Sequence, residues 1–237
     1  MKNMPLIILI IVFFASMATK ASIIEYRGFS RDASSNIVAG NGVEWLMWDV
    51  NKGKSIKEAL EKYSDAGWML ATDNHIISLF NIFQFGNSDW STPGYNNTIY
   101  YSAPRSEGGL TVHEQFLQLF GITQFTSCTT LSFDCNVLST DPQSYTNVLY
   151  SAAKNATKPY RNAVVSSPHT RVSAGITRKD GGYALLGEHV HTNPYVSFSF
   201  QSVALVRPKS VSPVSVSLSS TFSLLALGLI TLMYRRR

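Results

Sequence analysis

Two histidines near the end of the chain, His189 and His191, have a spacing that could support chemistry. In an extended strand, residues two apart point to the same face, so both imidazoles could approach one zinc or copper ion if a third ligand came from elsewhere. A metal-dependent hydrolase built on this pair is therefore one hypothesis. Surface histidines before a loop give the same pattern, and the isolated His75, His113 and His169 are interpreted as surface or satisfied core residues.

The remaining residues predict no catalytic or cofactor-binding site. The sequence has no Gly-x-Ser-x-Gly motif, no phosphate-binding glycine loop and no EF-type calcium loop. Glu44 and Asp49 flank a predicted strand on opposite faces, which makes them poor partners for hydrolysis by paired carboxylates. In an exported protein, Cys128 and Cys135 are expected to form a disulfide; as zinc ligands they would need a second Cys or His pair at zinc spacing. We therefore expect a protein that is not an enzyme.

Aromatic residues in the polar stretch 86–109 are candidates for ligand binding. This stretch is rich in Asn, Ser, Gly, Pro and Tyr and is predicted to be a long surface loop. Rings in such a loop can stack on sugars, or they can fold under the loop and hold it to the core. The candidates are Trp90, Tyr95, Tyr100 and Tyr101. A carbohydrate-binding module is the alternative hypothesis that they support.

Both ends of the chain have the composition of targeting segments. Residues 1–21 combine a basic start, an apolar stretch and small residues, as in a secretory signal peptide that is either cleaved or kept as an anchor. Residues 209–220 form a spacer rich in Ser, Val and Pro, and residues 221–237 continue it as an apolar segment with a basic end. The strictly apolar run is short, but counted from Val214 the tail could cross a bilayer of ~30 Å as a helix. The sequence thus predicts an exported domain, residues 22–208, attached to a membrane.

The formal charge of +5 comes from these predicted targeting segments. Five of the 20 basic residues are Lys2, Lys20 and the three terminal arginines, which leaves 15 basic residues against 15 acidic ones. The region between the ends is therefore about neutral and gives no support to nucleic-acid binding.

Helix signals are clearest at two capping boxes. Ser55 and Thr111 are each followed three residues later by a glutamate, which predicts that a helix starts after each of them. Thr72 is the expected cap of another helix between these two. Gly67 is expected to end the first helix in the left-handed conformation.

Strand signals occupy most of the remaining chain. The strand that opens at Val43 carries Trp45 and Trp48, which a regular strand would place on opposite faces. Residues 179–182 are predicted to form a hairpin turn, and residues 195–206 one long closing strand. Helices segregated from many strands indicate an α+β fold, with two to three helices around a mainly antiparallel sheet in a single domain.

Several short motifs resemble a domain that recurs in exported PEP-CTERM proteins of Gram-negative bacteria: Trp45-Leu46, Gly67-Trp68, Ala71-Thr72, Leu119-Phe120-Gly121 and Ala204-Leu205-Val206-Arg207. The tail is similar to a PEP-CTERM sorting signal. Pro213 precedes its apolar segment and Arg235, Arg236 and Arg237 follow it, although the glutamate of the family motif is absent beside Pro213. The resemblance implies an exosortase-like sorting protease as a partner and an association with exopolysaccharide.

Residues 67–72, Gly-Trp-Met-Leu-Ala-Thr, are also similar to the "GWRLPT" link of domains related to formylglycine-generating enzymes and C-type lectins. This similarity implies a C-type-lectin-like fold, with two helices beside a small sheet. No position matches the cysteine pair of the formylglycine-generating enzymes, so their activity is not implied. We expect an exported cell-surface or extracellular-matrix protein, held in the membrane before processing, with no cofactor and no nucleic-acid partner.

Overall fold

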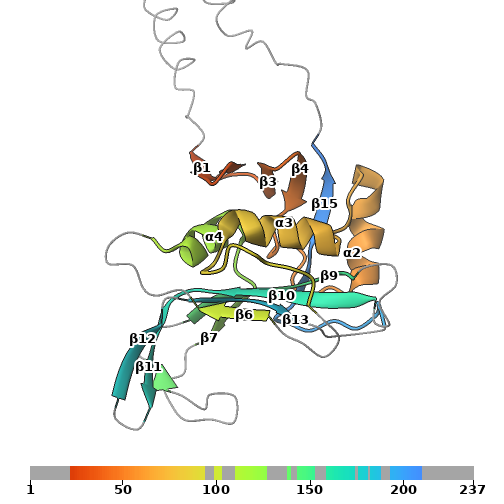
Figure 1. Cartoon of the computed structure of the whole chain (residues 1–237). Coiled ribbons are helices and arrows are strands. Elements are labelled where there is room, and N and C mark those ends of the chain that lie inside the picture. The colour runs from red at the N-terminus through yellow and green to blue at the C-terminus, as the bar shows by residue number, and fades with distance from the viewer. Residues whose placement is uncertain are drawn as a thin grey trace, which may run out of the picture.

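The computed structural model describes residues 22–93, 99–102, 110–126, 138–139, 143–152, 159–173, 176–180, 182–187 and 193–209. These residues form three α-helices, two larger and mostly antiparallel sheets, and a smaller third sheet (Figure 1). The predicted α+β class is confirmed. In this part of the chain, no helix has the length and apolar character needed to cross a membrane.

The first sheet is antiparallel throughout and contains the first and last strands. Its order is β1 (Ile23–Tyr26), β2 (Phe29–Asp32), β3 (Ile37–Gly40), β4 (Val43–Leu46), β15 (Leu205–Pro208) and β5 (Met69–Leu70). Arg27-Gly28 and Asn41-Gly42 form two-residue hairpin turns, in which all four residues have the positive φ of a type I′ turn. The chain enters β1 and leaves β15 at the same end of the molecule, the top of Figure 1.

The second sheet has the order β14 (Ser202–Val203), β9 (Gln143–Ser151), β10 (Tyr160–Ser166), β13 (Tyr183–Gly187) and β6 (Ile99–Ser102), with β7 (Gln124–Thr126) also on β9. Only the β14–β9 pair is parallel among these. Two predictions are wrong here. Residues 99–102 are not loop, because they pair with β13. Residues 195–201 are not strand, because strand pairing begins at Ser202.

The third sheet extends the second one, as β11 (His169–Ser173), β12 (Ile176–Asp180) and β8 (Leu138–Ser139). β12 pairs with β11 and not with β13, so the hairpin turn predicted at residues 179–182 is wrong. Gly182 instead directly precedes β13, where the two-stranded ribbon of β11 and β12 joins the second sheet. Its φ is +93°, and a Cβ there would come within 2.6 Å of the Ser166 carbonyl oxygen, so the bend requires glycine.

The three helices begin where the capping signals predict. They are α2 (Ile56–Tyr63), which continues into a 3₁₀ turn η1 (Ser64–Ala66), α3 (Asp73–Phe83) and α4 (Val112–Phe120). The capping boxes at Ser55 and Thr111 are complete, and Thr72 forms one with His75. Gly67 has a φ of +80° and ends the 3₁₀ turn in the left-handed region.

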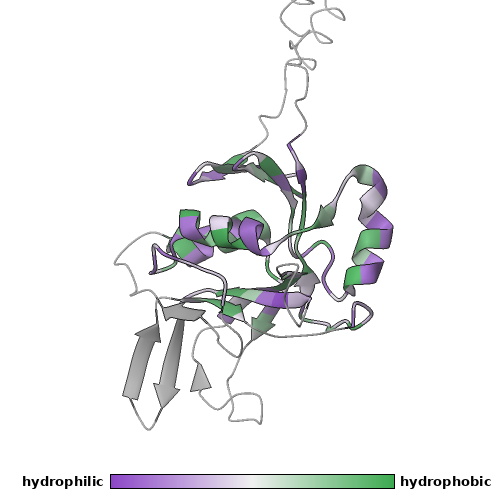
Figure 2. Ribbon diagram, turned by 45° about the vertical axis from the view of Figure 1, so that its right-hand side comes forward, coloured by the Kyte–Doolittle hydropathy of each residue, from purple (hydrophilic) through white to green (hydrophobic). Residues whose placement is uncertain are grey.

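Helices α3 and α4 lie between the two larger sheets, and α2 lies at the side (Figures 1 and 2). The expectation of helices around one sheet is therefore corrected to helices enclosed by two. Two arginines of the β1–β2 hairpin bind the C-terminal ends of α3 and α4. Arg27 donates to the carbonyls of Ile82 and Phe83 at 2.6 and 2.7 Å, and Arg31 donates to that of Gln118 at 2.8 Å. These contacts satisfy carbonyls that the helices themselves leave unpaired.

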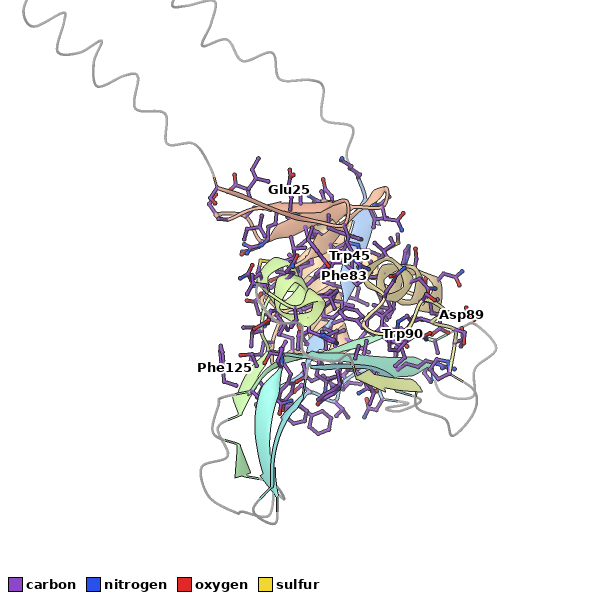
Figure 3. All side chains as sticks on the ribbon, turned by 60° about the vertical axis from the view of Figure 1, so that its left-hand side comes forward. Glu25, Trp45, Phe83, Asp89, Trp90 and Phe125 are labelled. Atoms are coloured by element: carbon purple, nitrogen blue, oxygen red, sulfur yellow. The ribbon has the colours of Figure 1, made fainter. Side chains whose placement is uncertain are left out.

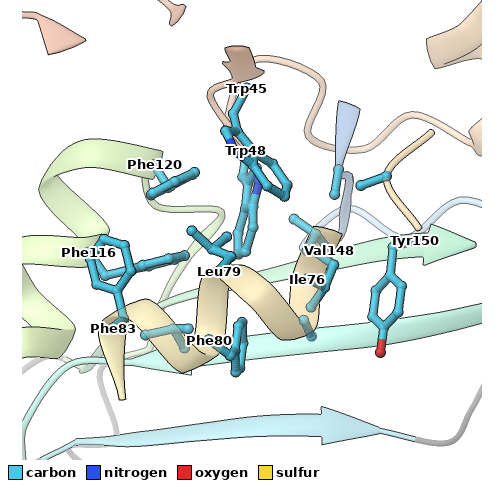
Figure 4. Close-up of a cluster of buried hydrophobic side chains, with 14 of the residues drawn as sticks. Trp45, Trp48, Ile76, Leu79, Phe80, Phe83, Phe116, Phe120, Val148 and Tyr150 are labelled. Carbon is cyan, nitrogen blue, oxygen red and sulfur yellow. The ribbon is translucent and has the colours of Figure 1, made fainter. Parts of the chain in front are cut away.

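The core between the sheets is mainly aromatic (Figure 4). Six of its large rings come from β4, α3, α4 and the segment after β4: Trp45, Trp48, Phe80, Phe83, Phe116 and Phe120. The two tryptophans lie in the same cluster, with ring centroids 6.5 Å apart, because the strand ends at Leu46 and the chain turns before Trp48. The prediction that they occupy opposite faces is wrong for this reason.

Candidate functional site

Three aromatic side chains are exposed in the short segment 195–200, which precedes β14. Tyr195 is 64% exposed, and Phe198 and Phe200 are each 37% exposed. The two phenylalanine rings stack, with centroids 5.6 Å apart and planes 26° apart. We call Tyr195, Phe198 and Phe200 the aromatic surface. Large apolar side chains that are exposed together mark interaction sites far more often than single ones do.

Backbone and side-chain hydrogen bonds hold this segment in place. Asn51, which is fully buried, donates through Nδ2 to the Val203 carbonyl at 2.8 Å and accepts from the Val203 N–H at 2.7 Å. The Gly53 N–H donates to the Gln201 carbonyl at 2.8 Å. These hydrogen bonds fix the backbone next to the aromatic surface, because they connect the residues that follow it to the loop between β4 and α2.

The start of α2 binds the other end of the same segment. The Lys57 N–H donates to the Pro194 carbonyl at 3.1 Å, and the Lys57 ammonium lies 4.7 Å from the centroid of the Tyr195 ring. Lys57 also approaches Glu61 at 3.4 Å, in a pair that is half exposed. A cation over a tyrosine face is attracted by the ring, which helps to orient Tyr195.

The aromatic surface lies far from the place where the chain enters and leaves the described fold. The first turn of α2 contacts Pro194, whereas the far end of η1 contacts Arg207, whose Nη1 donates to the Ala66 carbonyl at 3.1 Å. Arg207 precedes the last described residue, Lys209, by two positions. In Figure 1 the end of β15 and the start of β1 are both at the top, and α2 extends downward from there.

The sequence-predicted ligand residue Trp90 belongs to the core instead. Its side chain is 2% exposed, and its ring lies edge-on to Phe80 with centroids 5.0 Å apart. Asn81 holds its backbone through two hydrogen bonds, and the indole Nε1 donates to the Gln84 carbonyl at 3.3 Å. The indole therefore has no open face for a sugar, and Trp90 is corrected from a ligand-stacking residue to one that fixes the chain after α3.

The other predicted site residues are placed only in part. Tyr100 and Tyr101 lie on β6, opposite Leu185 and Ala184 of β13. The remaining predicted site residues lie outside the described residues: Tyr95, Cys128, Cys135, His189, His191, Pro213, Arg235, Arg236 and Arg237. Among the side chains that the structure does describe, no group of three or more His, Cys, Asp or Glu is placed to hold a metal ion.

A buried ionic cluster lies between α3 and the second sheet. Arg161 Nε is 3.7 Å from Asp73 Oδ1, and Arg161 Nη1 donates to the Pro93 carbonyl at 2.8 Å. Tyr150 lies nearby, and burial, together with the Asp73 charge, raises the pKa of its hydroxyl. A phenol with a raised pKa stays protonated and is a poor base or nucleophile. The cluster therefore attaches the segment ending at Pro93 to the second sheet, and it is a poor candidate for a catalytic site.

The sequence did contain a signal for the aromatic surface. Asn193-Pro194 is a typical turn initiator, and the Asn193 side chain accepts a hydrogen bond from the Tyr195 N–H at 2.9 Å. The Tyr, Val and Phe residues that follow favour a strand by type, and that prediction concealed their exposure.

Comparison of the chain with protein-family models, curated proteins and solved structures gave no match.

Proposed function

We propose that this chain is an exported cell-surface or extracellular-matrix protein that acts by binding rather than by catalysis. The observation that carries the proposal is the separation between the exposed aromatic surface and the end of the fold where the chain enters and leaves. A chain attached through its C-terminal segment would present Tyr195, Phe198 and Phe200 away from the attachment point. Such an arrangement suits contact with material outside the cell.

The sequence supports the export and attachment parts of this proposal. Residues 1–21 direct the chain out of the cytoplasm, residues 221–237 hold it in the membrane, and an exosortase-like protease acts near Pro213. The similarity to C-type-lectin-like domains belongs to the same proposal. It is supported by the presence of β1 and β15 in one sheet, with the chain entering β1 and leaving β15 at the same end of the molecule (Figure 1).

Carbohydrate binding is the second candidate, and the exposed rings favour it. Aromatic side chains supply large contact areas at little cost in conformational entropy, and a tyrosine hydroxyl adds a polar group. With Trp90 in the core, this role passes to Tyr195, Phe198 and Phe200. The matrix polysaccharide is then the natural material for the protein to contact.

A deletion strain tests the proposal. Loss of the chain should change biofilm formation or cell-surface properties, and the wild-type chain should restore them. A chain with Tyr195→Ala, Phe198→Ala and Phe200→Ala should be exported normally but should not restore them. Phe125→Ala is the matched control, because Phe125 is exposed on β7 (Figure 3), and β7 lies away from α2 (Figure 1). An unchanged surface in the deletion strain would refute the proposal.

The metal-dependent hydrolase hypothesis at His189 and His191 stays a prediction with its own test. Metal analysis of the protein purified from its host should find stoichiometric zinc or copper if this hypothesis is right. A metal-free protein that still restores the deletion strain would remove it.

A further inference from the structure

Lysines border the aromatic surface. Lys52 and Lys54 flank Gly53, whose N–H is bonded to the carbonyl of Gln201, the residue after Phe200. Lys52 is exposed and Lys54 is half-buried. Lys57 lies over the ring of Tyr195. Three ammonium groups therefore come from a short stretch of chain that is bonded directly to both ends of the aromatic segment.

Of these three lysines, only Lys57 has an ion-pair partner on α2. Glu61 is the ion-pair partner of Lys57. The Glu58 carboxylate accepts hydrogen bonds at 2.8 Å from both the N–H and the hydroxyl of Ser55, as part of the capping box. Within the described residues, Lys52 and Lys54 have no ion-pair partner, although hydrogen bonds from Ser55 and, to a smaller extent, the charge of Lys54 lower the pKa of Glu58. The border of the aromatic surface thus carries positive charge that an external anion can meet.

We propose that the aromatic surface, together with Lys52, Lys54 and Lys57, binds an acidic polysaccharide of the uronic acid type. This inference rests on the proposed function and adds the chemical class of the ligand. The rings can pack against the apolar faces of the sugars, while the lysines meet their carboxylates. Each such contact is weak when exposed, but a polymer makes many of them at once, so binding becomes strong through effective concentration.

A neutral polysaccharide fits this site less well, because it would use the rings but would not meet the charges of Lys52 and Lys54. An anionic lipid surface also attracts aromatic and basic side chains. It is disfavoured here because the chain leaves the fold at the opposite end from the aromatic surface. A tethered protein would then hold this surface away from its own membrane.

Binding to defined probes tests the inference. The protein is purified from its own host in mild detergent, with whichever ends it retains. Its binding is measured to immobilised polygalacturonate, to neutral dextran, and to vesicles of phosphatidylcholine and phosphatidylglycerol. Polygalacturonate should bind best, and its binding should weaken strongly when NaCl is raised from ~0.05 to ~0.5 M, because exposed charges are screened over that range.

Matched variants assign the binding to this surface. Lys52→Gln with Lys54→Gln should weaken polygalacturonate binding by about tenfold, the effect of losing two exposed ion pairs. Tyr195→Ala with Phe198→Ala should weaken it similarly. The control Lys62→Gln, at the far end of α2, should leave it unchanged. Circular dichroism spectra that match the wild-type spectrum would show that the variants are folded.

Three results would overturn the inference: equal binding to dextran, preferential binding to the vesicles, or full polygalacturonate binding by the double lysine variant. The proposed function fails separately, through the deletion strain. A strain with an altered surface combined with no polygalacturonate binding would remove the acidic ligand and keep the surface role.

Discussion

His113 provides the sharpest prediction about stability. This histidine is fully buried at the start of α4, and its ring centroid is 5.1 Å from that of Phe85. Neither ring nitrogen has a hydrogen-bond partner in the described part of the chain. Burial lowers the pKa of His113 to about 4, from an ordinary value of 6.5. The folded protein therefore keeps this ring neutral over a pH range in which the unfolded chain takes up a proton.

The sign and size of the effect follow from linkage. Well above pH 6.5, for example at pH 7.5, the ring is mostly neutral in both states, and His113 adds little pH dependence to the free energy of unfolding. As the pH falls from 6.5 towards 4, only the unfolded state gains the proton, so stability is lost. A difference of about 2.5 pKa units corresponds to about 3 kcal/mol once the pH is below 4, and to about 2 kcal/mol at pH 5.

The assay compares wild type with His113→Leu, which removes the titration and keeps an apolar side chain of similar size. Urea unfolding followed by tryptophan fluorescence gives the free energy of unfolding at pH 7.5 and pH 5. Wild type should lose about 2 kcal/mol more than the variant between these two values, with equal m values. Because the result is a difference between proteins, titration of the other groups cancels. Equal losses in both proteins would refute the reasoning.

Three further predictions concern stability, each measured by urea unfolding at pH 7.5. Ser55→Ala should lower the free energy of unfolding by about 1 kcal/mol, because it removes the N-cap of α2; no change would show that the cap is dispensable. Arg161→Met should cost about 3–5 kcal/mol, because it removes the ionic partner of buried Asp73, and a loss below 1 kcal/mol would contradict a tight buried pair. Trp90→Ala should cost about 3–5 kcal/mol, whereas exposed Phe125→Ala should cost about 0.5 kcal/mol or less; equal costs would place Trp90 outside the core.

Local features of the fold could be predicted from the sequence. The caps at Ser55 and Thr111 depend on residues three positions apart, so the pattern alone identifies them. The left-handed conformation at Gly67 is local in the same sense. The α+β class also follows from the order of helix and strand signals.

Features that depend on distant partners could not be predicted in this way. The pairing of β12 with β11 is set by the register of the whole ribbon, and nothing within residues 179–182 specifies it. Trp48 enters the same cluster as Trp45 because its N–H donates to the carbonyl of Phe120, 2.6 Å away and far along the chain. Such contacts arise from tertiary packing, which overrides the alternation of a regular strand.

The same reason explains why Tyr195 replaces Trp90 as a candidate ligand-binding residue. Trp90 and Tyr195 both lie in polar stretches near aromatic neighbours, and residue type does not separate them. Asn81 and Gln84 draw Trp90 into the core, whereas the bonds at Asn193 and Lys57 leave Tyr195 outside. Exposure is therefore a property of the fold rather than of the local sequence.

The exported chain should present Tyr195 to the outside of the cell, and labelling on intact cells tests this most directly. A chain with Tyr195→Cys is produced in its host and treated with a membrane-impermeant maleimide, with the wild-type chain as the control for native thiols. The variant should be labelled on intact cells to the level reached after permeabilisation. Labelling only after permeabilisation would contradict it.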